Sequence, residues 1–172
     1  FEVGDVGRLT IGGDVQGGSV QNSGRMLVGE VDFLGIGGSI IGGGAATATI
    51  EAGRIGQLVV AGSLTGGGLE PLRIEALANR FEPAPEVPFG SITIGGNVTF
   101  TRIHAGFATS FGQPSPDVQI GNVTVQGNWI ASDLVAGALP GPSGDFGDGD
   151  DVLAGPVNDP NFIARIAAIS IK

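Results

Sequence analysis

The stretch FGSITIGGNV, residues 89–98, decides the fold, because degenerate versions of it recur along the chain and align without gaps. A self-similar period of about 20 to 50 residues is the signature of a repeat architecture. Here the repeats start near residues 6, 31, 55, 89, 120 and 166, and the shortest unit is 24 residues long (55 − 31). The other versions are VGRLTIGGDV (6–15), VDFLGIGGSI (31–40), IGQLVVAGSL (55–64), IGNVTVQGNW (120–129) and the shorter IAAISIK (166–172).

Three positions of the repeat are apolar in every version. The last two are two residues apart, which is the period of a β-strand, so both side chains point to the same side. We therefore expect a short strand in each repeat with its apolar face towards a core. The columns are Val6, Val31, Ile55, Phe89, Ile120 and Ile166, then Leu9, Leu34, Leu58, Ile92, Val123 and Ile169, then Ile11, Ile36, Val60, Ile94, Val125 and Ile171.

A glycine and a small polar residue follow each complete strand pattern, which is typical of a corner. We expect the polar side chains to satisfy the turn backbone of neighbouring repeats rather than to bind a ligand. A second strand is predicted around the column Val20, Ala45, Leu69, Ile103 and Leu134. A third apolar patch, around Leu27, Ile50 and Ile74, is recognisable in the first three repeats only. The corner residues are Gly13, Gly38, Gly62, Gly96 and Gly127, followed by Asp14, Ser39, Ser63, Asn97 and Asn128.

A unit of two or three short strands cannot bury its own apolar face, whereas stacking equivalent strands about 4.7 to 4.9 Å apart builds a continuous core. The sequence thus predicts an all-β fold, a parallel β-helix of five to six coils that forms one domain over residues 1–172. The strong preference of parallel crossovers for the right hand makes it right-handed. Glycine accounts for 33 residues, but no three-residue period is present and 41% of the chain is hydrophobic, which argues against collagen and disorder.

The recurring unit IGxLxIGG(D/S/N)V resembles repeats of large bacterial surface proteins of the β-helix class, including adhesin-like and autotransporter passenger-like solenoids. The resemblance implies an extracellular or cell-surface stalk in a bacterium. It carries no catalytic residue that could be transferred to this chain.

Charge and composition argue against several functions. The formal net charge of −9 opposes binding to nucleic acid, which needs clustered basic residues. No apolar run reaches the ~18 residues of a membrane span. Polysaccharide-cleaving β-helices need carboxylates on adjacent coils, yet Asp14 is the only acidic residue of the corner column. The single histidine, His104, has no Ser or Cys motif to pair with and is expected at the surface. We expect that the protein is not an enzyme.

Three long loops, residues 78–88, 105–118 and 138–165, interrupt the repeats and are predicted to leave the same corner. The last contains GDFGDGDDVLAG, residues 144–155. Ca²⁺ takes six to eight oxygen ligands from flexible acidic loops, so Asp145, Asp148, Asp150 and Asp151 are the candidate ligands of a single calcium site. The alternative is a solvated acidic loop.

A structural role uses every recurring feature of the sequence. The last repeat stops at Ile171 and Lys172, where the next corner glycine is due, so we expect a bare β-edge at each end. Such edges invite end-to-end stacking of copies or continuation into a longer chain. The alternative is an adhesin whose flank loops bind a glycan or a protein. A polysaccharide-active enzyme is the third interpretation.

Overall fold

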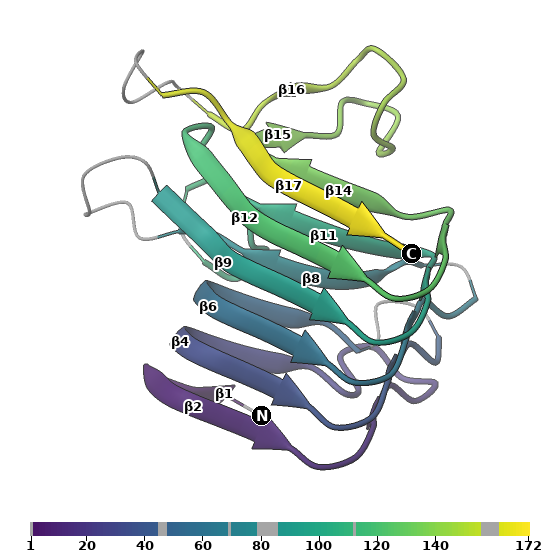
Figure 1. Ribbon diagram of the computed structural model, residues 1–172. Helices are drawn as coiled ribbons and strands as arrows, with labels where there is room; N and C mark the ends of the chain where they lie inside the picture. The colour runs from purple at the N-terminus through teal and green to yellow at the C-terminus, as the bar shows by residue number, and fades with distance from the viewer. Residues whose placement is uncertain (1, 45–47, 69, 79–85, 112, 156–161) are drawn as a thin grey trace.

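The computed structural model describes residues 2–44, 48–68, 70–78, 86–111, 113–155 and 162–172. All secondary structure in these ranges is β-strand, and nearly all strand pairs are parallel (Figure 1). The all-β expectation is therefore confirmed. Within the same ranges no helix is long and apolar enough to cross a membrane.

The front face of Figure 1 is made by one strand from each repeat. Each strand pairs in parallel with its equivalent in the next repeat, and all three predicted apolar columns are in register. The prediction of the stacked columns is therefore confirmed. The strands are β2 (Val6–Ile11), the second halves of β4 (Met26–Ile36) and β6 (Ile50–Val60), then β9 (Glu86–Ile94), β12 (Val118–Val125) and β17 (Arg165–Ile171).

Two further faces complete each repeat except the last, which contains β17 alone. A side face contains the two-residue strands that follow the corner, and a back face lies behind the front strands in Figure 1. The long strands β4 and β6 take part in both the back and the front face, so they join the two into one sheet. The side strands are β3 (Val15–Gln16), β5 (Ile40–Ile41), β7 (Leu64–Thr65), β10 (Val98–Thr99) and β13 (Trp129–Ile130); the back strands are β1 (Glu2–Val3), β8 (Leu72–Ala76), β11 (Thr101–Ala105) and β14 (Asp133–Ala136).

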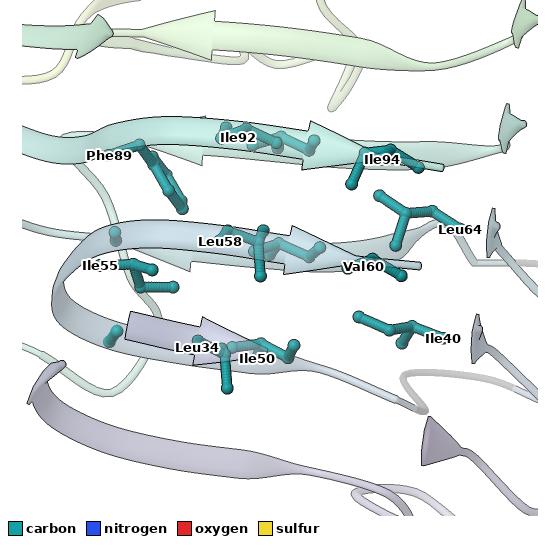
Figure 2. Packing of buried hydrophobic residues seen from close by; sticks show 14 of the residues in the cluster. Leu34, Ile40, Ile50, Ile55, Leu58, Val60, Leu64, Phe89, Ile92 and Ile94 are labelled. Carbon is teal, nitrogen blue, oxygen red and sulfur yellow. The ribbon is translucent and has the colours of Figure 1, made fainter. Parts of the chain in front are cut away.

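The core fills the space between the faces, and like residues stack on like (Figure 2). Leu58 and Ile92 are neighbours in the middle column, and both are fully buried. Leu64, on the side face, and Ile50, on the back face, belong to the same core. Neighbouring repeats cover the core of each repeat from above and below. A single repeat has too few apolar residues to exclude water by itself.

The corner residues form a ladder of hydrogen bonds between repeats, as predicted. The backbone N–H of Ser39 donates to Asp14 Oδ1 at 2.7 Å, and that of Ser63 donates to Ser39 Oγ at 3.0 Å. Asn97 and Asn128 continue the ladder, with donor to acceptor distances of 3.0 and 2.8 Å. Glycine leaves room for it, since a Cβ at Gly96 would displace Ser63 Oγ, the atom that accepts from Asn97. The polar column therefore satisfies the turn backbone.

The predicted second-strand column is wrong. Ile103 and Leu134 are in register with Ile74, on the back face, so they belong to the third patch. Val20 lies in a turn with 70% of its side chain exposed, while Ala45 and Leu69 lie outside the described residues. The repeats do not align without gaps beyond the side strands, because the corners that follow differ in length. Residues 17–25 separate β3 from β4, whereas Phe100 alone separates β10 from β11.

The third patch is therefore present in five repeats rather than three. Its first member is Met26, since Leu27 is in register with the outward-facing Glu51. Phe100 and Ala131 make the abrupt corners of the last two repeats, with φ of 46° and 45°. In these two repeats the shorter corner brings the third patch closer to the side strand. Its members there are Ile103 and Leu134.

The long loops all connect a back strand to the next front strand. They follow β8, β11 and β14, so the shared corner is confirmed. Residues 79–85 of the first loop and 156–161 of the last lie outside the described residues. The last segment is not all loop, because β15 (Ala138–Leu139) and β16 (Val152–Leu153) form an antiparallel pair within it.

Candidate functional site

Polar side chains point outward along the back face in two ladders. One ladder contains Glu51, Glu75 and His104, and the other contains Arg73, Arg102 and Asp133. The sequence carried a signal for them in TIEA (49–52), RIEA (73–76) and RIHA (102–105), which align once the corner lengths are known. None of these residues lies in the corner column on which the sequence-based expectation about carboxylates depended.

The two glutamates anchor the loop between β11 and β12. The backbone N–H and the hydroxyl of Thr109 both donate to Glu75 Oε2 at 3.0 Å. The N–H of Ser110 donates to Glu51 Oε2 at 2.8 Å, and Arg25 Nε forms an ion pair with Glu51 Oε1 at 2.9 Å. Burial raises the pKa of Glu75, and the hydrogen bonds from Thr109 act in the opposite direction. Both carboxylates are therefore committed to holding the loop.

His104 was expected at the surface, and that prediction is wrong. Its side chain is buried between the loop after β11 and the loop after β14. The ring stacks on Phe107 with a centroid distance of 5.3 Å and meets the edge of Phe146. Nε2 lies 2.6 Å from the carbonyl oxygen of Ala138. Burial lowers the pKa of His104 to about 4, so the ring is neutral at pH 7 and Nε2 donates to that carbonyl.

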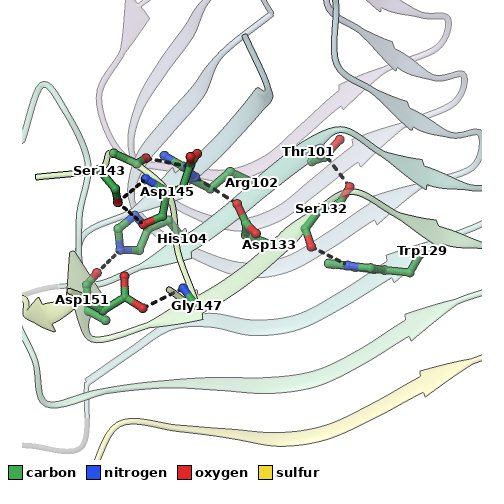
Figure 3. A network of polar contacts seen from close by, with 12 residues as sticks. Thr101, Arg102, His104, Trp129, Ser132, Asp133, Ser143, Asp145, Gly147 and Asp151 are labelled. Atoms are coloured by element: carbon green, nitrogen blue, oxygen red, sulfur yellow. Dashed lines mark hydrogen bonds and ion pairs between the residues drawn. The ribbon is translucent and has the colours of Figure 1, made fainter. Parts of the chain in front are cut away.

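A cleft of about 540 Å³ opens beside this histidine, between the arginine ladder and residues 143–146. Arg102 Nε forms an ion pair with Asp133 Oδ2 at 3.3 Å (Figure 3), and its guanidinium lies over the ring of Phe146. The same guanidinium donates to the carbonyl oxygen of Gly144 at 3.3 Å. The strand β11 and the acidic loop are thus held together at the cleft.

The acidic loop brings three of its four candidate ligands together. One carboxylate oxygen from each of Asp148, Asp150 and Asp151 lies within 4.8 Å of the others. Asp145 is not part of this group and lines the cleft instead. The four residues predicted as one site are therefore divided between two places.

Donors within the loop set the arrangement of these carboxylates. The N–H of Ser143 donates to Asp150 Oδ2 at 3.0 Å, and that of Gly147 donates to Asp151 Oδ2 at 2.8 Å. The positive φ of Gly147 and Gly149, 84° and 94°, lets the backbone turn between the aspartates. Hydrogen bonding from the Ser143 hydroxyl is the main cause that lowers the pKa of Asp148.

Comparisons of the chain with protein-family models, curated protein sequences and solved structures gave no match. What the cleft and the acidic loop can bind is therefore inferred from the side chains that line them.

Proposed function

We propose that this chain is a right-handed parallel β-helix and serves as a structural module of an extracellular surface protein, appendage or filament. The parallel register of equivalent residues, repeat on repeat, supports the coiled architecture. The right-handed preference of parallel crossovers supports the hand, and the repeat's resemblance to bacterial surface proteins supports the location.

The observation that supports a stacking role is the exposed apolar face of the strand β17. Ile169 and Ile171 occupy the same columns as Ile92 and Ile94, which are fully buried. In the last repeat these two side chains are 52% and 50% exposed. The strand β17 is also the outermost of its sheet. An edge strand with an apolar face is a template for further β-structure, supplied by a second copy or by continuation of the same chain.

End-to-end stacking is tested by charging this surface. We expect the wild-type chain to form concentration-dependent assemblies by sedimentation velocity, seen as filaments by negative-stain microscopy. The double variant Ile169→Asp with Ile171→Asp is expected to be monomeric, because burying two unpaired carboxylates opposes association. Gln57→Asp, at an exposed position of β6 in the middle of the front face, serves as the control and should still assemble. A wild-type chain that is monomeric at every concentration would contradict stacking.

A binding module is the second proposed function, since the described parts of the last two loops are tied to the back face by specific contacts. Thr109 and Ser110 bind the glutamates, and Arg102 and His104 bind the carbonyls of Gly144 and Ala138. Loops held in this way present a fixed surface on one flank. Catalysis is the weakest proposal, because Glu51 and Glu75 are engaged in anchoring.

Calcium binding by the acidic loop is a separate proposal, supported by the convergence of Asp148, Asp150 and Asp151. A ligand present at about 100 times its Kd adds about 2.7 kcal/mol to the free energy of unfolding. We therefore expect EGTA to lower the Tm of the wild-type chain and Ca²⁺ to restore it. Asp148→Ala with Asp151→Ala should abolish the difference, whereas Asp145→Ala, outside the cluster, should retain it. A wild-type Tm that ignores Ca²⁺ would disprove the proposal.

A further inference from the structure

Arg73 lines the cleft and forms none of the ion pairs found among the described residues. Arg73 Nε is shut off from solvent and has no partner among the described residues. Arg25, Arg54 and Arg102, by contrast, each pair with a carboxylate. A buried donor without an acceptor is costly, and more so when it is charged. An acceptor that enters the cleft can therefore reach the terminal nitrogens of Arg73 but not its enclosed Nε, and Glu75 is the nearby carboxylate whose pKa the charge of Arg73 lowers.

Arg73 does not act alone, because its register neighbour on β11 is Arg102. Both line the cleft, so two guanidinium groups from adjacent strands lie along one wall. A guanidinium presents its donors in a planar fork that matches the two oxygens of a carboxylate. Because Arg102 is already bound to Asp133 and Gly144, Arg73 supplies the donors on this wall that remain for a planar carboxylate.

The rest of the lining sets limits on what carries that group. Glu70, Asp133 and Asp145 also face the cleft. Asp133 is paired with Arg102, while Glu70 and Asp145 are exposed carboxylates that can accept from the hydroxyl groups of a ligand. Their charges would repel a multiply charged anion such as phosphate. The rings of Phe100 and Phe146 supply apolar surface, and the cleft volume is within the range of roughly 300 to 1,000 Å³ of small-molecule sites.

We propose that this cleft binds an acidic sugar, a ring that carries one carboxylate and several hydroxyl groups. The carboxylate accepts from Arg73, with Arg102 beside it. The hydroxyl groups donate to Glu70 and Asp145, and the apolar side of the ring packs against Phe100. A neutral sugar would leave Arg73 without a charged acceptor, and a simple carboxylate would leave the acidic lining without donors.

This site goes beyond the structural role and is physically separate from it. The cleft lies on the flank, between β8, β11 and residues 143–146, whereas stacking uses the end strand β17. Variants of the cleft are therefore expected to leave assembly unchanged.

The test is a titration of the ¹⁵N-labelled chain, followed by NMR, with glucuronate, glucose, acetate and a hyaluronan tetrasaccharide. Glucuronate should shift resonances of Arg73, Arg102 and Ser143, with a Kd at least about tenfold below those of glucose and acetate, the difference expected for a charge-assisted hydrogen bond. Tighter binding of the tetrasaccharide assigns a polymeric source, and equal binding assigns the single sugar. Equal binding of glucuronate and glucose, or of glucuronate and acetate, would overturn the proposal.

Two variants and a control locate the binding. Arg73→Gln should abolish glucuronate binding, and Arg73→Lys, which keeps the charge but loses Nε and the planar fork, should weaken it by about tenfold or more. Arg8→Gln, on β2 in the first repeat, is the matched control and should bind as the wild type does. Thermal unfolding checks that each variant is folded; if Arg73→Gln is not, Arg73→Lys decides. Unchanged binding by a folded Arg73 variant would overturn the assignment.

Discussion

Ile92→Ala is expected to lower the free energy of unfolding by about 3 kcal/mol, whereas Ile169→Ala should cost less than about 1 kcal/mol. The two residues occupy the same column, each in register with Val123. Ile92 is fully enclosed, so truncation leaves a cavity between two repeats. Ile169 is 52% exposed, and its truncation removes less buried surface. Urea denaturation of both variants, at concentrations where the chain is monomeric, measures the difference.

This pair tests the stack directly, because the chemical change is identical and only the position differs. In assembled material the cost at Ile169 should rise towards that at Ile92, since stacking would bury the same column. Equal costs in the monomer would mean that the last repeat is covered in solution, which contradicts the open end.

Acidification is expected to destabilise the wild-type chain through His104. The folded-state pKa is about 4, and the unfolded value is about 6.5. Above pH 6.5 the ring is neutral in both states and contributes no pH dependence. As the pH falls from 6.5 to 4, the unfolded state takes up a proton that the folded state does not, so stability is lost. The loss reaches about 3 kcal/mol near pH 4.

His104→Gln isolates this effect, because its side-chain amide can still donate to the carbonyl of Ala138. The buried Glu75 has a raised pKa and so favours the folded state as the pH falls. That contribution is common to both proteins and cancels in the comparison. We expect the two stability profiles, measured by urea denaturation, to diverge below pH 6.5. Parallel profiles would show that His104 is not protected from protonation.

The apolar columns could be predicted because they depend on local chemistry alone. Leu58 and Ile92 recur at a fixed distance from a corner glycine, and a strand has only one way to place residues two apart on one face. The corner ladder followed for the same reason, since Ser39 and Asn97 occupy equivalent turns. When one position of a repeat is stacked on its equivalent in the next repeat, every position at the same distance from it along the strand and corner is stacked as well.

The cleft and the anchored loops could not be predicted from the same pattern. Arg73 and Arg102 are 29 residues apart in the sequence (102 − 73), and their register depends on the lengths of corners that differ from repeat to repeat. His104 alternates in sequence with the buried Ile103, which marks it as outward-facing. Only the loops after β11 and β14 convert that outward position into a buried one.

The sequence by itself determined the stacked strands, the corner ladder and the shared origin of the loops, because each follows from a short periodic pattern. Tertiary structure decided which polar residues meet: it separated Asp145 from Asp148, Asp150 and Asp151, and it joined Arg73, Arg102 and residues 143–146 around one cleft. The reason is that loop folding and corner length set these contacts, and neither is periodic.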